Sequence, residues 1–146
     1  MKLAQALIAK SLAETILVAT LGIVFYLSAF PPYFHGWGEA SNGSISGWVV
    51  DNSAPGSRVE VQLFIDGQFV ATALASQPRP DVVSAGWAND EWHGYIFSAP
   101  LLPVGLHEAR VYALHSSSGG QRQSLQLVGD PIKFLRDETG RLSKAE

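Results

Sequence analysis

The chain has 146 residues, no cysteine and a formal net charge of −3, and 47% of its residues are hydrophobic. The absence of cysteine excludes a disulfide-stabilised scaffold and a cysteine-ligated zinc site, so packing must hold the fold together. The mildly acidic balance argues against nucleic acid and anionic lipid as partners.

The first feature along the chain is an uncharged apolar run from Thr15 to Phe30, TILVATLGIVFYLSAF. Such a run is costly to leave in water and favourable in lipid, and counting from about Ser11 it reaches the roughly 20 residues that cross a bilayer. Lys10 and Glu14 are four residues apart, so on a helix they share a face and can pair. We therefore predict a cytoplasmic stub and one transmembrane helix within residues 1–32.

A cleaved signal peptide is the alternative interpretation of this segment. Cleavage after Leu27-Ser28-Ala29 would place a bulky leucine where a small residue is needed, which favours an uncleaved anchor. Pro31-Pro32 cannot continue a helix and is expected to end it. Small residues in the predicted helix offer contact points for neighbouring membrane helices: Ala19, Gly22, Ser28 and Ala29.

Flanking charge predicts the orientation of the anchor. Lys2 and Lys10 precede the span, whereas the first basic residue after it is Arg58. Because positive charge stays inside, we expect a single-pass protein of the inner (cytoplasmic) membrane, with its N-terminus cytoplasmic and its C-terminal domain periplasmic. Aromatic rings settle at headgroup depth. Residues 33–42 are accordingly predicted to be an interfacial linker whose membrane-interface residues are Tyr33, Phe34 and Trp37.

From about residue 43 to 135 the pattern changes to short alternating runs. In Arg58–Ile65 the residues Val59, Val61, Leu63 and Ile65 share one face, which predicts a strand buried on one side. Asp66-Gly67 follows at once and predicts a tight type I′ hairpin turn. Further strands are expected at Ser44–Val50, Gln68–Ala73, Trp92–Ser98, His107–His115, Gln123–Val128 and Ile132–Leu135.

These segments make about seven strands, with no convincing helix outside the tether. They indicate an all-β, immunoglobulin-like sandwich of roughly 100 residues, residues 43–135, preceded by the single transmembrane helix. Ser116–Gly120 is expected to be a flexible hairpin connection. The tail, residues 136–146, is charged and is expected to be flexible unless a partner orders it.

One ordered set of motifs runs through this region: Gly47-Trp48-Val49-Val50-Asp51, Ile65-Asp66-Gly67, Arg79-Pro80-Asp81-Val82, His93-Gly94-Tyr95-Ile96-Phe97 and Gly105-Leu106-His107. The set resembles a small bacterial immunoglobulin-like accessory module that is found with glycosyltransferases and envelope proteins. That resemblance implies a β-sandwich without a catalytic centre of its own. Whatever this module accompanies is expected to be another chain.

Several residues of these motifs are candidates for contact with a ligand or partner. Exposed tryptophan can stack on sugar or anchor a protein interface, and Trp87 is the best candidate, although it can also fold back onto the sandwich. Trp92 and Trp48 are expected in the core. Arg79 and Asp81 are expected to pin the long connection 76–91 through a charge-assisted hydrogen bond, with ligand contact as the alternative.

Catalytic and metal sites are not predicted. The four histidines, at positions 35, 93, 107 and 115, lack the spacing of a zinc site, and no serine lies in a nucleophile elbow. Asn89-Asp90-Glu91 with Asp81 could bind calcium, but the regular acidic spacing of a calcium loop is missing, so an exposed turn is favoured. Asn42-Gly43-Ser44 matches a glycosylation acceptor, which matters only in a eukaryotic secretory setting.

The first functional hypothesis is a non-catalytic accessory subunit, without cofactor, of a larger membrane complex of the respiratory, secretory or photosynthetic reaction-centre type. Its expected partners are other integral membrane proteins and the lipid bilayer, and no nucleic acid. The second is a carbohydrate- or envelope-binding module that acts with a separate glycosyltransferase. A small hydrolase is the third and is disfavoured, because no nucleophile and base are paired in the sequence.

Overall fold

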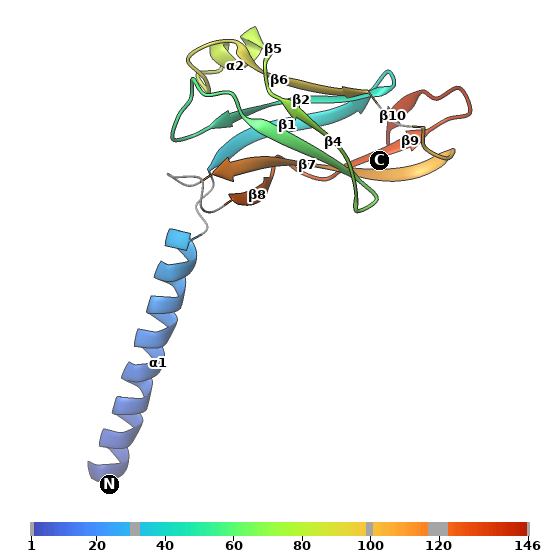
Figure 1. Cartoon of the computed structure of the whole chain (residues 1–146). Coiled ribbons are helices and arrows are strands. Elements are labelled where there is room, and N and C mark those ends of the chain that lie inside the picture. Colours follow the sequence, from blue (N-terminus) through green and yellow to red (C-terminus); the bar gives the residue numbers. More distant parts are fainter. Residues whose placement is uncertain (1, 30–32, 99–100, 117–122, 146) are drawn as a thin grey trace. The chain divides into compact units, whose positions relative to one another are not determined.

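The computed structural model describes residues 2–29, 33–98, 101–116 and 123–145, which belong to two compact units divided between Pro31 and Pro32. The first unit contains the helix α1 (Lys2–Ala29), and the second is a β-sandwich (Figure 1). The predicted fold class, a β-sandwich after one long apolar helix, is confirmed.

The helix α1 is apolar along almost its whole length. Leu3–Tyr26 is long and apolar enough to cross a membrane, with a mean hydropathy of 1.8. Thr15 and Thr20 keep this surface apolar, because their hydroxyls donate to the carbonyls one turn back, at 2.9 and 2.8 Å. The predicted pair between Lys10 and Glu14 is present, with 3.7 Å between Nζ and Oε1.

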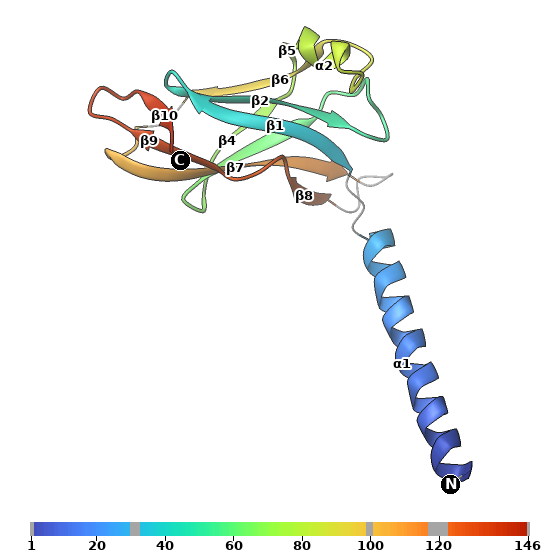
Figure 2. The same cartoon turned by 180° about the vertical axis from the view of Figure 1, so that it is seen from behind.

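Two antiparallel sheets form the sandwich (Figure 2). The four-stranded sheet has the order β1 (Phe34–Ser41), β2 (Ser44–Asp51), β6 (Trp92–Ser98), β5 (Gln77–Pro78). The six-stranded sheet has the order β10 (Leu142–Lys144), β9 (Ile132–Arg136), β7 (Gly105–Ser116), β3 (Glu60–Ile65), β4 (Gln68–Leu74), and β8 (Gln123–Leu127) pairs with β7.

This strand order is that of an immunoglobulin-like sandwich. In that fold one sheet is ordered A-B-E-D and the other contains C, F and G. Here β1-β2-β6-β5 corresponds to the first sheet, and β3, β7 and β9 correspond to C, F and G. Strands β8 and β9 pair with successive parts of β7, so together they occupy the position of one long strand.

The core lies between the sheets and follows the predicted alternation. Val61, Leu63 and Ile65 of β3 are buried, as are Tyr95 and Phe97 of β6, which confirms that these side chains point inward. The turn between β3 and β4 has φ of 51° at Asp66 and 79° at Gly67, as a type I′ turn requires. The Asp66-Gly67 turn and the alternation of hydrophobic residues in β3 therefore predicted this hairpin correctly.

The segment 33–42 is not a linker, and this prediction was wrong. Phe34–Ser41 forms β1, which pairs along its whole length with β2 through a turn at Asn42 and Gly43, where φ is 49° and 80°. Phe34 is buried in the core rather than available to a membrane interface. The Asn-Gly pair is itself a hairpin signal. The sequence analysis considered these residues only as a glycosylation acceptor and therefore did not predict the turn.

Two further segments differ from the predictions. A short helix, α2 (Pro80–Ser84), lies in the connection 79–91 and buries Val82. Within the predicted flexible tail, Leu142–Lys144 forms β10, which pairs with β9, and Leu142 is buried because it packs in the main hydrophobic core. The predicted connection Ser116–Gly120 lies largely outside the described residues.

Two glycines on neighbouring strands make room for one buried tyrosine. A Cβ at Gly38 or Gly47 would collide with the hydroxyl of Tyr95, so both positions need glycine. The Tyr95 hydroxyl donates to the carbonyl of Trp37 at 3.3 Å, and burial raises the pKa of this phenol. The backbone of β1 at Trp37 is thereby fixed against the core.

Candidate functional site

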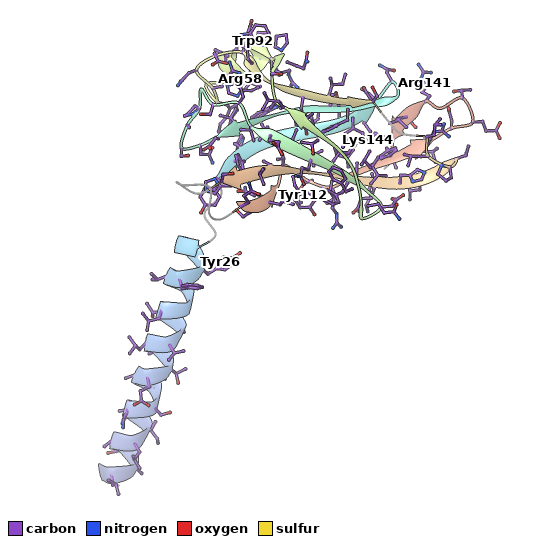
Figure 3. The ribbon with its side chains drawn as sticks, viewed as in Figure 1. Tyr26, Arg58, Trp92, Tyr112, Arg141 and Lys144 are labelled. Atoms are coloured by element: carbon purple, nitrogen blue, oxygen red, sulfur yellow. The ribbon has the colours of Figure 1, made fainter. Side chains whose placement is uncertain are left out.

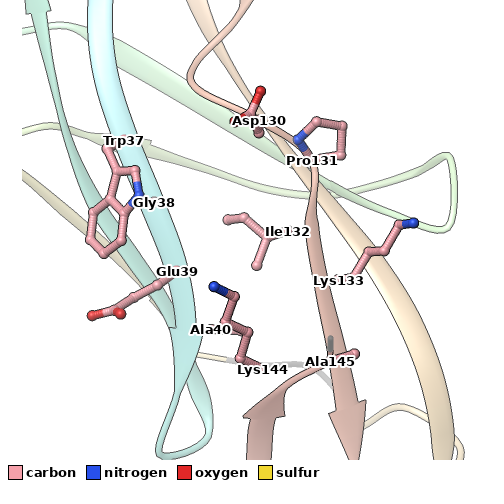
Figure 4. A pocket seen from close by; sticks show the side chains of 10 residues that line it. All are labelled: Trp37, Gly38, Glu39, Ala40, Asp130, Pro131, Ile132, Lys133, Lys144 and Ala145. Atoms are coloured by element: carbon pink, nitrogen blue, oxygen red, sulfur yellow. The ribbon is translucent and has the colours of Figure 1, made fainter.

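A groove of about 370 Å³ opens along one side of the sandwich, between edge strand β1 of one sheet and the β9–β10 edge of the other (Figure 4). Its volume is within the roughly 300–1,000 Å³ of small-molecule sites. Its side chains come from three separate parts of the sequence. Those that can bind or orient a ligand are Trp37, Glu39, Asp130, Ile132, Lys133 and Lys144.

Strand alternation decides which residues of β1 face the groove, and it turns Trp37 and Glu39 toward the outer face of the four-stranded sheet (Figure 4). Gly36, Gly38 and Ala40 occupy the inward positions of β1, so Trp37 and Glu39 occupy the outward ones. Trp37 is 47% exposed, which leaves a large part of the indole accessible. The location of Trp37 at a membrane interface stays a prediction, and its place beside a groove was not predicted.

The other side of the groove combines an apolar residue with charged ones. Figure 4 shows Ile132 and the side chain of Lys144 in the space between β1 and β9. Lys144 comes from β10 and is exposed to solvent; Figure 3 labels this residue. Asp130 and Lys133 flank Ile132 in the chain, and both line the groove.

The four charged side chains of the groove balance one another. Glu39 and Asp130 supply two carboxylates, and Lys133 and Lys144 supply two ammonium groups, so the formal charge of the lining cancels. No carboxylate of this set lies within 4.0 Å of an ammonium group in the described part of the chain. Figure 4 shows only Lys144 of these four extending into the space between β1 and β9, whereas Glu39 and Lys133 extend away from it on opposite sides.

Trp87, the predicted ligand contact, has one face of its indole covered by a histidine. It is 48% exposed and stacks on the imidazole of His35, with 3.9 Å between ring centres and 19° between planes. One face of the indole is thus covered. His35 also contacts Trp48, whose ring centre is 5.4 Å away.

Two tryptophans expected in the core lie elsewhere. Trp48 is on the outer face of its sheet, where it packs against a small second cluster beneath α2, formed by Val50, Val82 and Ala88. Trp92 is 45% exposed and lies beside α2 (Figure 3), where it lines a shallow hollow with Val83. Both predictions were wrong. The alternation of side chains along a strand does not show which face of the sheet is covered by another segment, here the connection that contains α2.

Arg79 and Asp81 form the predicted charge-assisted pair. The guanidinium donates from Nε to Oδ1 at 2.8 Å and from Nη2 to Oδ2 at 2.7 Å. This hydrogen bonding lowers the pKa of Asp81. The pair spans the start of α2 and holds the connection over Val50, and the methylene stem of Arg79 covers Gly94.

The acidic residues proposed for calcium are engaged separately. Asp90 pairs with Arg58 at 3.1 Å, while Asp81 pairs with Arg79. Within the described residues no three histidine or acidic side chains gather in a way that would hold a metal ion. The predicted absence of a catalytic site and of a cofactor stays a prediction.

Two histidines are buried, with opposite consequences for their protonation. His107 donates from Nδ1 to Asp66 at 2.6 Å and from Nε2 to the Pro103 carbonyl at 2.9 Å, and these bonds raise its pKa. His93 is fully buried, and burial lowers its pKa although Asp90 lies 3.4 Å away. Both residues act within the fold rather than at the groove.

No match was found when the chain was compared with models of protein families, with curated proteins and with solved structures. The chemistry of the groove must therefore be inferred from its own side chains. Of these, sequence reasoning named only Trp37. The alternation of glycine with larger residues in HGWGEA was an available signal for β1, but nothing local links Glu39 to Lys144.

Proposed function

We propose that the chain is a non-catalytic accessory subunit of a membrane protein complex, tethered by α1 in the inner membrane with its sandwich in the periplasm. The observation that carries the proposal is the complete exposure of α1. All twelve of its large hydrophobic side chains whose exposure is described, from Leu3 to Tyr26, are more than half exposed. The sandwich meanwhile has a closed core of its own.

The energetic cost of leaving this helix in water supports a membrane location. Burying one large aliphatic or aromatic side chain contributes about 1.5–3 kcal/mol. For twelve such residues the total is on the order of 20 kcal/mol even at the lower figure. Lipid and neighbouring membrane helices are the environments that recover this energy for a helix that is apolar on every side.

Charge supports the proposed orientation. Lys2 and Lys10 belong to the N-terminal end, and no further lysine or arginine occurs before Arg58. The positive-inside rule then puts the N-terminus in the cytoplasm. The resemblance of the sandwich motifs to a bacterial accessory module supports a role beside another chain, rather than an activity of its own.

Small residues on α1 are proposed to form the contact with the partner helix. Ala19 and Gly22 are three residues apart and share a face, and Ser28 and Ala29 are the other small residues predicted as contact points. A Cβ at Gly22 would meet nothing within 4 Å. This position therefore leaves room for close approach of a second helix backbone.

The test is purification of the tagged full-length chain from its native membranes in a mild detergent. We expect a defined set of membrane proteins at fixed stoichiometry. Gly22→Leu should abolish their recovery, since the isolated helix accommodates the leucine but a closely packed partner does not. Val24→Leu, on the opposite side of the helix, is the matched control and should leave recovery unchanged.

Either of two results would refute this function. One is recovery of the folded wild-type chain alone at every detergent concentration that extracts it. The other is equal recovery of the same proteins with Gly22→Leu and wild type, which would separate the association from the small-residue face.

A further inference from the structure

We infer that the edge strand β4 pairs with β4 of a second copy of this chain, so that two six-stranded sheets join into one continuous antiparallel sheet. Each copy contributes only its sandwich to this contact. The pairing therefore does not depend on a partner complex or on α1 crossing a membrane.

The strand β4 has a free edge. It ends the six-stranded sheet, and within the described residues no strand pairs with its other side (Figure 1). The Ala75 N–H donates to the Val59 carbonyl at 2.8 Å, which sets the phase of the ladder with β3. Thr72 and Leu74 accordingly lie at positions whose backbone N–H and C=O groups point away from β3. The Leu74 carbonyl accepts from the Ser76 hydroxyl at 3.4 Å, and its second lone pair can accept from another strand.

This edge lacks the features that usually protect a strand from pairing. Lysine, proline and inward-pointing charges are the common ones. Residues 67–77 contain no charged residue and no proline. A bulge at Val70 precedes residues 71–74 and leaves the pairing of this stretch with β3 regular. Phe69 and Leu74 are 57% and 53% exposed, so the edge also carries apolar surface that a second strand would cover.

The other edges of the sandwich are short, protected or covered. The strand β5 has two residues, of which Pro78 has no N–H, and β10 has three, of which Lys144 is exposed. The strand β1 faces β9 and β10 across the groove. The strand β8 lies beside the start of β1, where the Gln126 side chain accepts from the Tyr33 N–H at 2.9 Å. Among the described strands, β4 is thus the long, uncharged and uncovered edge.

A second copy is the occupant that fits this edge best. Its β4 is already an extended strand, so pairing does not have to order a flexible segment. A two-fold axis makes the two strands antiparallel, as in the rest of the sheet, and closes the contact at two copies. Because β4 is uncharged, self-pairing brings no like charges together on adjacent strands. The same axis places Thr72 of one copy close to Thr72 of the other.

The first test uses the absence of cysteine from the chain. In the full-length protein in mild detergent, a short bismaleimide should convert Thr72→Cys into a covalent dimer. Ser143→Cys is the matched control and should stay monomeric, because Ser143 is an exposed residue of β10, at the opposite edge of the same sheet. Adding Gly22→Leu, which tests the proposed function, should leave the cross-link at Thr72 unchanged. The two proposals can therefore fail separately.

The second test exchanges charge across the two-fold axis. Two differently tagged copies that both carry Thr72→Lys, or both Thr72→Glu, should no longer co-purify, because like charges on adjacent strands repel. One copy with Thr72→Lys and one with Thr72→Glu should co-purify again. Ser143→Lys in both copies is the control and should leave co-purification unchanged. Near-UV circular dichroism of each variant checks that the sandwich is folded.

Three outcomes would overturn the inference. The first is equal cross-linking of Thr72→Cys and Ser143→Cys. The second is co-purification that does not differ between like and opposite charges at position 72. The third is a cross-link in native membranes that joins Thr72→Cys to a different protein instead of a second copy, which would assign the edge to that protein.

Discussion

The ion pair between His107 and Asp66 makes a specific prediction about stability and pH. The His107 imidazole is 9% exposed and makes hydrogen bonds from both nitrogens, one to a carboxylate and one to a backbone carbonyl. Neither acceptor has a proton to give, so both ring nitrogens must carry one. The hydrogen bond to Asp66 is the main cause of the raised pKa of His107, and the Glu108 N–H is the main cause of the lowered pKa of Asp66.

The perturbation is His107→Gln, which cannot carry the charge. A hydrogen bond between charged groups contributes about 1.5–3 kcal/mol, and solvent screening reduces this where a partner is exposed. Because the Asp66 side chain is 50% exposed, we expect a loss of about 1–2 kcal/mol in the free energy of unfolding near pH 6. For a domain of this size the melting temperature should fall by roughly 3–10 °C.

The sign of the pH dependence follows from the two pKa shifts. The contribution of His107 is fully present below its ordinary pKa of 6.5 and is lost as pH rises through the higher pKa of the folded state. That of Asp66 is present above its ordinary pKa of 3.8 and is lost as pH falls through the lowered one. The difference in stability between wild type and His107→Gln should therefore be largest between about pH 4 and 6.5 and should shrink toward pH 9.

The assay is thermal unfolding of the full-length protein in detergent, followed by near-UV circular dichroism from pH 4 to 9. His115→Gln is the control, because His115 stacks on Tyr33 and the structure gives it no carboxylate partner in the described residues. Equal melting curves for wild type and His107→Gln at pH 5.5 would refute the reasoning. So would a pKa of His107 at or below 6.5 in a nuclear magnetic resonance titration.

Three other predictions concern the sandwich. Gly47→Ala should lower the free energy of unfolding by about 1–3 kcal/mol in urea titrations, because its Cβ would collide with Tyr95; an unchanged midpoint would contradict the packing described. Since burial lowers the pKa of His93, its contribution to stability is present above pH 6.5 and is lost as pH falls through the folded-state pKa. His93→Gln should accordingly flatten the acid-side loss of stability, and a decline as steep as in wild type would exclude His93 as its source. Arg79→Met removes the partner of Asp81 and should speed amide hydrogen exchange in α2, whereas equal exchange would show that the pair does not hold the helix.

Local signals were sufficient for most strands but not for β1, α2 and β10. Asp66-Gly67 and the alternation of Val59–Ile65 predicted a hairpin that the structure contains, because turn chemistry and side-chain period are properties of adjacent residues. The strand β1 was missed because two of its inward positions, Gly36 and Gly38, have no hydrophobic side chain that would indicate burial. Side chains far away in the sequence fill the space there, Val128 at Gly36 and Tyr95 at Gly38.

The candidate groove depends even more on residues that are far apart in the sequence. Trp37 could be singled out from the sequence as an aromatic residue that follows an apolar run. Because only its neighbours in the chain were known, it was assigned to a membrane interface. Glu39, Ile132 and Lys144 share a groove with it only because the edges of two sheets meet. No spacing rule connects residues that are brought together by strand order.

The sequence by itself determined the apolar helix, the type of fold and the central hairpin, because each depends on interactions over a few residues or on composition. The tertiary structure alone decided that Trp48 lies under α2, that Leu142 is buried and that residues of β1, β9 and β10 line one groove. The physical reason is that burial and proximity across a sandwich depend on which strand edges and connections meet in space, which adjacent residues do not encode.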